Sequence, residues 1–235
     1  MRLSRRSFIL AFSSTAMVTI AKAREYTGGV PWTPKAALPP QEPDHRQSYL
    51  TAEERKFLTA AVDRLIPEDD YPSASQAGVV DFIDYQLAGA FGRGDIYYLQ
   101  GPFEDGLPTQ GYQGEAPALL YRQAIEDIDK GLADTAGKRF SELSETDQDT
   151  VLKRLSEGEA DLPTVDGKTF FDMLWQNTRE GYFGDPVYGG NRDMAGWRML
   201  GFPGARYDYR PWIDHNGQPV KLDPVSVAGY PQQGQ

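Results

Sequence analysis

Five segments in which apolar residues recur at the spacing of an α-helix constrain the fold of this chain more than any other feature. In the clearest of them, Thr51 and Glu54 have the spacing of a capping box, which satisfies free backbone N–H groups at a helix start. Behind this box the apolar residues repeat until Pro67 ends the pattern. They are Phe57, Leu58, Ala61, Val62, Leu65 and Ile66.

Four more helices are predicted further along the chain. The second covers Val79 to Ala90, and apolar residues mark the third between positions 119 and 132. Ser144 can cap the fourth, which carries apolar residues at positions 151–155. The fifth covers positions 170–178 and ends near Gly181. No segment alternates well enough to predict a strand, so the fold class is mostly α.

Glycine, proline and aromatic residues dominate the C-terminal third, and no helical period is sustained after Gly181. Residues 92–116 contain six glycines and read as a long loop. We therefore predict one helical domain of about five helices over residues 50–235, with a long irregular tail from about residue 182. Residues 24–49 are rich in proline and predict an extended arm.

Residues 1–23 have the layout of a twin-arginine export signal. Arg5 and Arg6 precede an apolar stretch of about 13 residues that begins at Phe8, and Ala21 and Ala23 provide a small-x-small cleavage site. This stretch is too short and too polar for the roughly 20 residues of a membrane-spanning helix. We expect the signal to be removed and the mature protein to reach the periplasm through the twin-arginine translocase.

The charge balance excludes several partner classes. The full chain has a formal net charge of −10, and the predicted signal contributes four basic residues and no acidic one. Removing the signal leaves 20 basic and 34 acidic residues, a net charge near −14. Such a chain is repelled by nucleic acids and by anionic lipid surfaces, so we expect no nucleic acid partner and only an indirect membrane association.

The sequence contains no motif for a catalytic, cofactor or metal site. There are no cysteines, which excludes disulfides, thiolate metal sites and covalently attached haem. Neither His45 nor His215 accompanies a nucleophile motif, and the acidic run at 68–70 lacks the spacing of a calcium loop. We expect no catalytic residue, metal or cofactor on this chain.

One glycine-rich segment, residues 184–204, combines large aromatic residues with Arg and Met. Glycine permits close backbone approach, and these side-chain types are enriched in protein–protein contacts. The segment is a candidate partner interface, and packing of its aromatic residues inside the molecule is an equally open interpretation. The candidate residues are Asp185, Tyr188, Gly189, Gly190, Asn191, Arg192, Trp197 and Phe202.

The sequence at 184–197, Gly-Asp-Pro-Val-Tyr-Gly-Gly-Asn-Arg-Asp-Met-Ala-Gly-Trp, followed by Gly-Phe-Pro-Gly-Ala at 201–205, resembles the hallmark of the gluconate 2-dehydrogenase subunit 3 family. The first predicted helix, from Leu50 to Pro67, and the Ala-Gly-Val at 77–79 are similar to the family as well. The resemblance covers about residues 50–205.

This resemblance implies a small subunit of a periplasmic, membrane-associated dehydrogenase complex. Its partners would be a large FAD-containing subunit of the glucose–methanol–choline type and a multihaem cytochrome c subunit. FAD and haem c would then belong to the partners, and this chain would lend its export signal to the large subunit. Two alternatives remain: a stand-alone periplasmic carbohydrate-active enzyme that uses two of the many carboxylates, and a carbohydrate-binding module with an aromatic platform.

Overall fold

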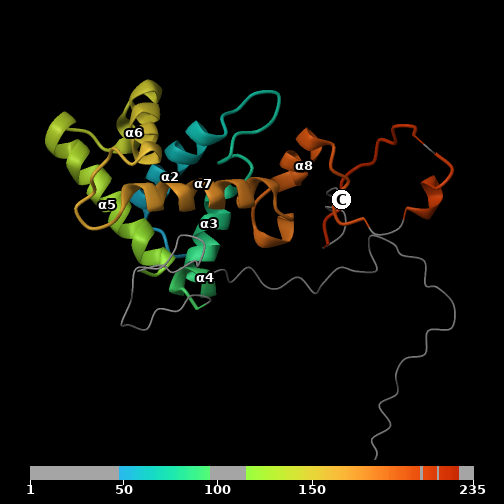
Figure 1. Cartoon of the computed structure of the whole chain (residues 1–235), viewed down its shortest axis with the longest axis horizontal. Helices are drawn as coiled ribbons and strands as arrows, with labels where there is room; N and C mark the ends of the chain where they lie inside the picture. Colours follow the sequence, from blue (N-terminus) through green and yellow to red (C-terminus); the bar gives the residue numbers. More distant parts are fainter. Residues whose placement is uncertain (1–47, 96–114, 207–208, 216, 228–235) are drawn as a thin grey trace, which may run out of the picture. The chain divides into compact units, whose positions relative to one another are not determined.

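The structure, a computed structural model, describes residues 48–95, 115–206, 209–215 and 217–227. All of them belong to one compact unit, Pro34–Gln235. These residues form seven α-helices, short 3-10 turns and isolated β-bridges, and they contain no β-strand (Figure 1). The prediction of a mostly α fold is confirmed. The predicted export signal and the Pro-rich arm up to residue 47 lie outside the described residues.

Helix α2, Ala52–Leu65, begins as its sequence predicts. The Thr51 Oγ1 atom accepts a hydrogen bond from the Glu54 N–H at 3.2 Å, and the Glu54 carboxylate accepts one from the Thr51 N–H at 2.7 Å. Both halves of the capping box are therefore present. The apolar face of the helix is buried through Phe57, Leu58 and the two residues one turn later, at 61 and 62.

The second predicted helix is two helices in the structure. Helix α3 covers Val79–Ala88, and the four-residue helix α4 covers Ala90–Arg93. Gly89 between them is extended, with φ −94° and ψ −161°. A Cβ atom at Gly92 would lie 1.8 Å from the Leu87 carbonyl oxygen, so the chain turns back onto α3 more closely than a side chain allows. The predicted helix therefore begins at Val79 as expected but ends at Ala88, two residues earlier than predicted.

Helices α5, Pro117–Ala136, and α6, Glu145–Glu157, follow further along the chain. Most of the loop predicted over residues 92–116 lies outside the described residues, and its first two residues belong to α4. Helix α5 begins at Pro117, two residues before the apolar pattern that starts at position 119, because proline is favoured at the first position of a helix. The Ser144 hydroxyl accepts from the Asp147 N–H at 3.3 Å, which confirms the predicted cap of α6. A short 3-10 turn, η2 (Phe140–Glu142), lies between the two helices.

Helix α7, Gly167–Phe183, occupies the centre of the helical arrangement. It contacts α2, α3, α5, α6 and the short C-terminal helix α8 (Figure 1). The Asp166 carboxylate caps its start by accepting from the Thr169 N–H and hydroxyl, both at 2.6 Å. Every other long helix therefore packs on the helix that leads directly into the tail.

An aromatic cluster fills the core around α7. The rings of Phe57 and Phe140 lie 4.6 Å apart, and Tyr121 meets Phe170 edge-on at 5.4 Å. Burial raises the pKa of Tyr121, whose hydroxyl accepts from the Asn177 amide at 2.9 Å.

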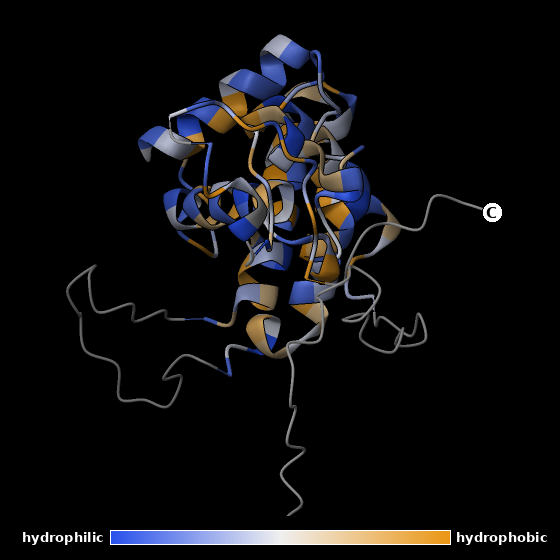
Figure 2. Ribbon diagram, turned by 90° about the vertical axis from the view of Figure 1, so that its right-hand side faces the viewer, coloured by the Kyte–Doolittle hydropathy of each residue, from blue (hydrophilic) through white to orange (hydrophobic). Residues whose placement is uncertain are grey.

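The helices carry both hydrophobic and hydrophilic residues (Figure 2). None of the helices in the described ranges is long and apolar enough to cross a membrane.

The tail beyond Phe183 is irregular, as predicted, but contains short elements. These are the 3-10 turns η3 (Pro186–Tyr188), η4 (Arg192–Met194) and η5 (Arg210–Trp212) and helix α8 (Ala195–Leu200). A six-residue helix spans less than two turns, so its apolar residues cannot show a helical period.

Candidate functional site

Asn191 fixes the conformation of the glycine-rich segment 184–204, which we call the tail segment. Its side chain is fully buried, and its backbone is left-handed, with φ 45° and ψ 47°. The amide nitrogen donates to the Gly184 carbonyl at 2.7 Å, and the amide oxygen accepts from the Gly196 N–H at 2.9 Å. Its own N–H donates to the Gly181 carbonyl of α7 at 2.7 Å. One residue thus joins both halves of the tail segment to α7.

Two glycines permit this close approach to α7. A Cβ atom at Gly190 would lie 2.1 Å from the Gly181 carbonyl oxygen, and one at Gly196 would lie 2.3 Å from that of Tyr182. No side chain fits at either position without moving the backbone. These two glycines therefore serve internal packing.

Trp197 extends the same packed surface. Its indole N–H donates to the Phe183 carbonyl at 2.6 Å, and its ring meets Phe202 edge-on at 5.3 Å. Trp197 is buried, whereas Phe202 is 46% exposed. The buried Trp197 ring therefore supports the exposed Phe202 ring from beneath.

Arg192 connects the tail segment to α3. Its N–H donates to the Ala77 carbonyl at 2.9 Å, and its guanidinium forms an ion pair with Asp81. Its side chain passes directly over Gly78, where a Cβ atom would lie 2.9 Å from Nε. Asp81 also pairs with Arg55 of α2 at 2.6 Å. The ion pairs place α2, α3 and the tail segment in one network.

Asp84 completes this network from a buried position on α3. Its carboxylate accepts hydrogen bonds from the Ser48 hydroxyl at 2.9 Å and from the N–H groups of Tyr49 at 2.7 Å and Leu50 at 2.9 Å. Arg55 adds a fourth contact at 2.7 Å. Because the donors come from residues more than 25 positions away in the sequence, periodicity could not identify this role.

Asp185 caps η3 and holds the last described residues. Its Oδ1 atom accepts from the Val187 N–H at 3.0 Å and from the Ser226 hydroxyl at 2.6 Å. Its Oδ2 atom accepts from the Val227 N–H at 2.8 Å. Gly189, with φ 104°, ends the same turn in a conformation that favours glycine.

Most of the exposed large apolar residues lie in the C-terminal part of the described sequence. Tyr188 on η3 is 56% exposed, and Leu200 on α8, which contacts α7, is 63% exposed. Nine large hydrophobic residues are exposed in the described part of the chain, and seven of them lie between positions 188 and 227. These seven are Tyr188, Leu200, Phe202, Tyr209, Ile213, Val220 and Val227. Exposed side chains of this type are candidates for contact with another protein.

The structure thus divides the eight candidate interface residues. Tyr188, Arg192 and Phe202 have exposed side chains, whereas Asn191 and Trp197 are buried and support the surface from beneath. Gly190 is also buried, and Asp185 and Gly189 are partly buried. The sequence analysis did not identify Leu200 as an exposed residue. Leu200 lies in a segment without an apolar period, so its sequence does not show whether the side chain is buried or exposed.

The electrostatics of the tail segment differ from the acidic average of the chain. Arg192 and Arg198 are exposed on it, and the Arg198 Nε atom donates to the Asp193 carbonyl at 2.9 Å. Burial raises the pKa of Tyr182 beneath the segment, so its hydroxyl stays neutral and donates to the Pro72 carbonyl at 2.7 Å. The arrangement can bind another apolar surface that carries some negative charge.

Residues considered for catalysis or metal binding are not assembled into a site in the described part. His215 is exposed in a turn, and the acidic run at 68–70 is exposed in a bend. Across the described ranges, no group of three or more His, Asp or Glu residues could hold a metal ion. His45 lies outside these ranges.

The export signal is also beyond what the structure describes. Arg5, Arg6, Phe8 and the cleavage residues Ala21 and Ala23 all precede residue 48. Their role in export stays a prediction.

The described residues form a helical fold whose tail segment is packed on α7 and exposes several large apolar side chains. A family model described as gluconate 2-dehydrogenase subunit 3 matches residues 52–204, more than half of the chain. The chain belongs to the gluconate 2-dehydrogenase subunit 3 family, and its resemblance to this family is confirmed. No curated protein and no solved structure matches the chain. Membership agrees with a role as a small subunit of a dehydrogenase complex.

Proposed function

We propose that the chain is the non-catalytic small subunit of a periplasmic flavoprotein dehydrogenase complex. Its partners are a large FAD-containing subunit of the glucose–methanol–choline type and a multihaem cytochrome c subunit, which carries the association with the membrane. This chain binds the large subunit and supplies its twin-arginine signal. Membership of the subunit 3 family supports the proposal.

The observation that carries the proposal is the exposed apolar surface of the tail segment. Burying a large apolar side chain contributes about 1.5–3 kcal/mol. Tyr188, Leu200 and Phe202 are all exposed in the free chain, so a partner surface gains this contribution by covering them. The exposed guanidinium of Arg198 lies in the same segment and favours a partner surface with carboxylates at its edge.

The packing beneath the surface supports tight binding. Association is weakened when loops and side chains must become ordered in the interface. The three hydrogen bonds of Asn191 and the indole bond of Trp197 already order the tail segment against α7. A preorganised surface of this kind loses less conformational entropy when it binds.

Charged substitutions at the exposed residues test the proposal. The double variant Tyr188→Asp with Leu200→Asp places two carboxylates in the apolar surface and leaves Asn191, Trp197 and Phe202 unchanged. We expect it to lose the flavin-containing partner in co-purification by at least tenfold while its far-ultraviolet circular dichroism is unchanged. Leu119→Asp is the control, because Leu119 is 45% exposed on α5, outside the tail. Retention of the partner by the double variant would contradict the proposed interface.

A further inference from the structure

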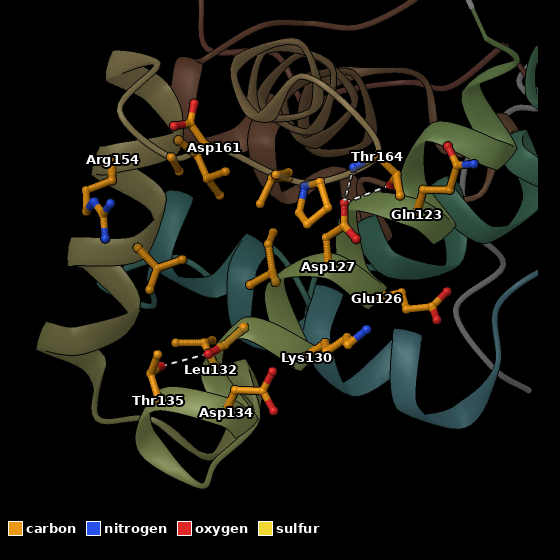
Figure 3. A pocket seen from close by; sticks show the side chains of 17 residues that line it. Gln123, Glu126, Asp127, Lys130, Leu132, Asp134, Thr135, Arg154, Asp161 and Thr164 are labelled. Carbon is orange, nitrogen blue, oxygen red and sulfur yellow. Dashed lines mark hydrogen bonds between the residues drawn. The ribbon is translucent and has the colours of Figure 1, made fainter.

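A groove lies between α5, α6 and the loop that connects α6 to α7 (Figure 3). Its volume is about 670 Å³, which is within the range of small-molecule binding pockets. The Asp127 carboxylate of α5 accepts from the Thr164 N–H at 2.9 Å and from its hydroxyl at 2.7 Å. These bonds fix the loop against α5 and so define one wall of the groove.

The groove is separate from the tail segment. It adjoins the loop before α7, whereas the tail segment follows the last residue of α7. Seventeen helical residues separate these two ends, a length of about 25 Å at 1.5 Å per residue. A ligand of the groove is therefore not a ligand of the exposed apolar surface described above.

The lining of the groove combines an apolar base with an acidic edge. Carboxylates at Glu126, Asp134 and Asp161 line it, and none of the three forms an ion pair within the described ranges. Lys130 and Arg154 are the basic residues of the lining, so acidic residues outnumber basic ones. The larger apolar side chains of the lining are Ile128, Leu132, Val151, Leu155 and Leu162, and Ala160 and Pro163 also line the groove.

Gly131 leaves the surface of α5 open where the helix lines the groove. Glycine inside a helix is less favourable than alanine by about 1 kcal/mol. Gly131 lies within α5 and lines the groove, yet a Cβ atom there would meet nothing within 4 Å. No contact in the described part of the chain requires glycine at this position. A missing side chain does leave room for a second backbone to approach the helix.

We propose that this groove binds a segment of a partner subunit in which an apolar side chain is flanked by Lys or Arg. The apolar base takes the apolar side chain, and the unpaired carboxylates face the basic residues. A second copy of this chain, with a net charge near −14 once the signal is removed, would be repelled, as would nucleic acid or an anionic lipid surface. The inference rests on the proposed function, because the partner belongs to the same complex.

The absence of cysteine makes the test direct, since a single introduced thiol is the only one in the chain. Gly131→Cys places the thiol in the groove, and Ala133→Cys places it on an exposed position of α5 that does not line the groove. Maleimide labelling is compared between the isolated chain and the complex recovered from membranes. We expect at least tenfold slower labelling at position 131 in the complex and equal labelling at position 133.

A photo-crosslinker attached to the thiol at position 131 then identifies the bound segment by mass spectrometry. We expect the crosslinked peptide to come from a partner subunit and to contain at least two Lys or Arg residues beside an apolar residue. Glu126→Lys combined with Asp134→Lys is expected to restore fast labelling at position 131. Equal labelling in the two states, or crosslinks only to an acidic segment, to lipid or to a second copy, would overturn it.

The outcomes also separate this proposal from the proposed function. If flavin co-elutes with the Gly131→Cys chain but the thiol is unprotected, the groove proposal alone is wrong. If no flavin co-elutes even with the unsubstituted chain, both proposals are wrong.

Discussion

Asn191 has a left-handed backbone conformation and forms three hydrogen bonds, and each of these features limits which residue can replace it. Asparagine tolerates this conformation better than other residues with a Cβ atom, and only its side chain offers a donor and an acceptor together at this length. Alanine at 191 loses both side-chain bonds and adds backbone strain of about 1 kcal/mol.

We therefore expect Asn191→Ala to lower the free energy of unfolding by about 2–4 kcal/mol, since each lost bond at a buried group contributes about 1 kcal/mol or more. Urea unfolding followed by circular dichroism measures this change. Asn191→Gly is the control. Glycine also loses both side-chain hydrogen bonds, but it adopts a positive φ without strain, so Asn191→Gly should be less destabilising than Asn191→Ala. A change below 0.5 kcal/mol for alanine, on the scale of an ordinary surface substitution, would contradict the structural role.

Sequence reasoning located the important residues of the tail segment but did not separate buried from exposed ones. A helix or strand reveals its buried face through a period, and a glycine-rich segment has none. Asn191 and Tyr188 therefore look alike in the sequence, although one is fully buried and the other is 56% exposed. Asp84 was missed for a related reason, because its partners at positions 48–50 are distant in sequence.

At the scale of elements, local signals predict helix starts well and the shortest helices poorly. The caps at Thr51 and Ser144 involve residues three positions apart, so the sequence contains all the participants. The break at Gly89 and the helix α8 depend on tertiary contacts with α3 and α7 instead. The five long helices were therefore predictable, and α4 and α8 were not.

The Asp166 cap of α7 provides a pH-dependent test at this scale. Hydrogen bonds from the Thr169 hydroxyl and N–H lower the pKa of Asp166 below its ordinary value of 3.8. A carboxyl whose pKa is lower in the folded state stabilises that state above its unfolded pKa, and the stabilisation is lost as the pH falls through the folded value. We expect Asp166→Ala to be less stable than the unsubstituted chain by about 1 kcal/mol at pH 7.

This difference should shrink as the pH falls below about 4. Asp166→Ser is the matched control, because a serine hydroxyl caps the helix without titrating, so its advantage over alanine should persist at low pH. Thermal unfolding at pH 7 and pH 3 measures both differences. An alanine effect that is equal at the two pH values would show that the carboxylate is not the capping group.

For the whole molecule, the proposed role as a subunit requires export and binding to act together. The twin-arginine pathway carries folded proteins, so a partner bound in the cytoplasm can cross with this chain. We expect Arg5→Lys combined with Arg6→Lys to leave both this chain and the FAD-containing subunit in the cytoplasm, as measured by fractionation and immunoblotting. Lys22→Arg, a substitution in the same signal outside the arginine pair, should export normally. Export of the flavoprotein with the lysine pair would contradict the shared-signal model.

The most direct test of the central claim is purification of the tagged chain from its native membrane fraction, read by visible absorption. We expect flavin and c-type haem bands to co-elute with this chain in constant ratio, and a substrate screen on the eluate to identify the sugar or sugar acid oxidised. A colourless eluate that contains the folded chain alone would contradict the proposed role as a dehydrogenase subunit.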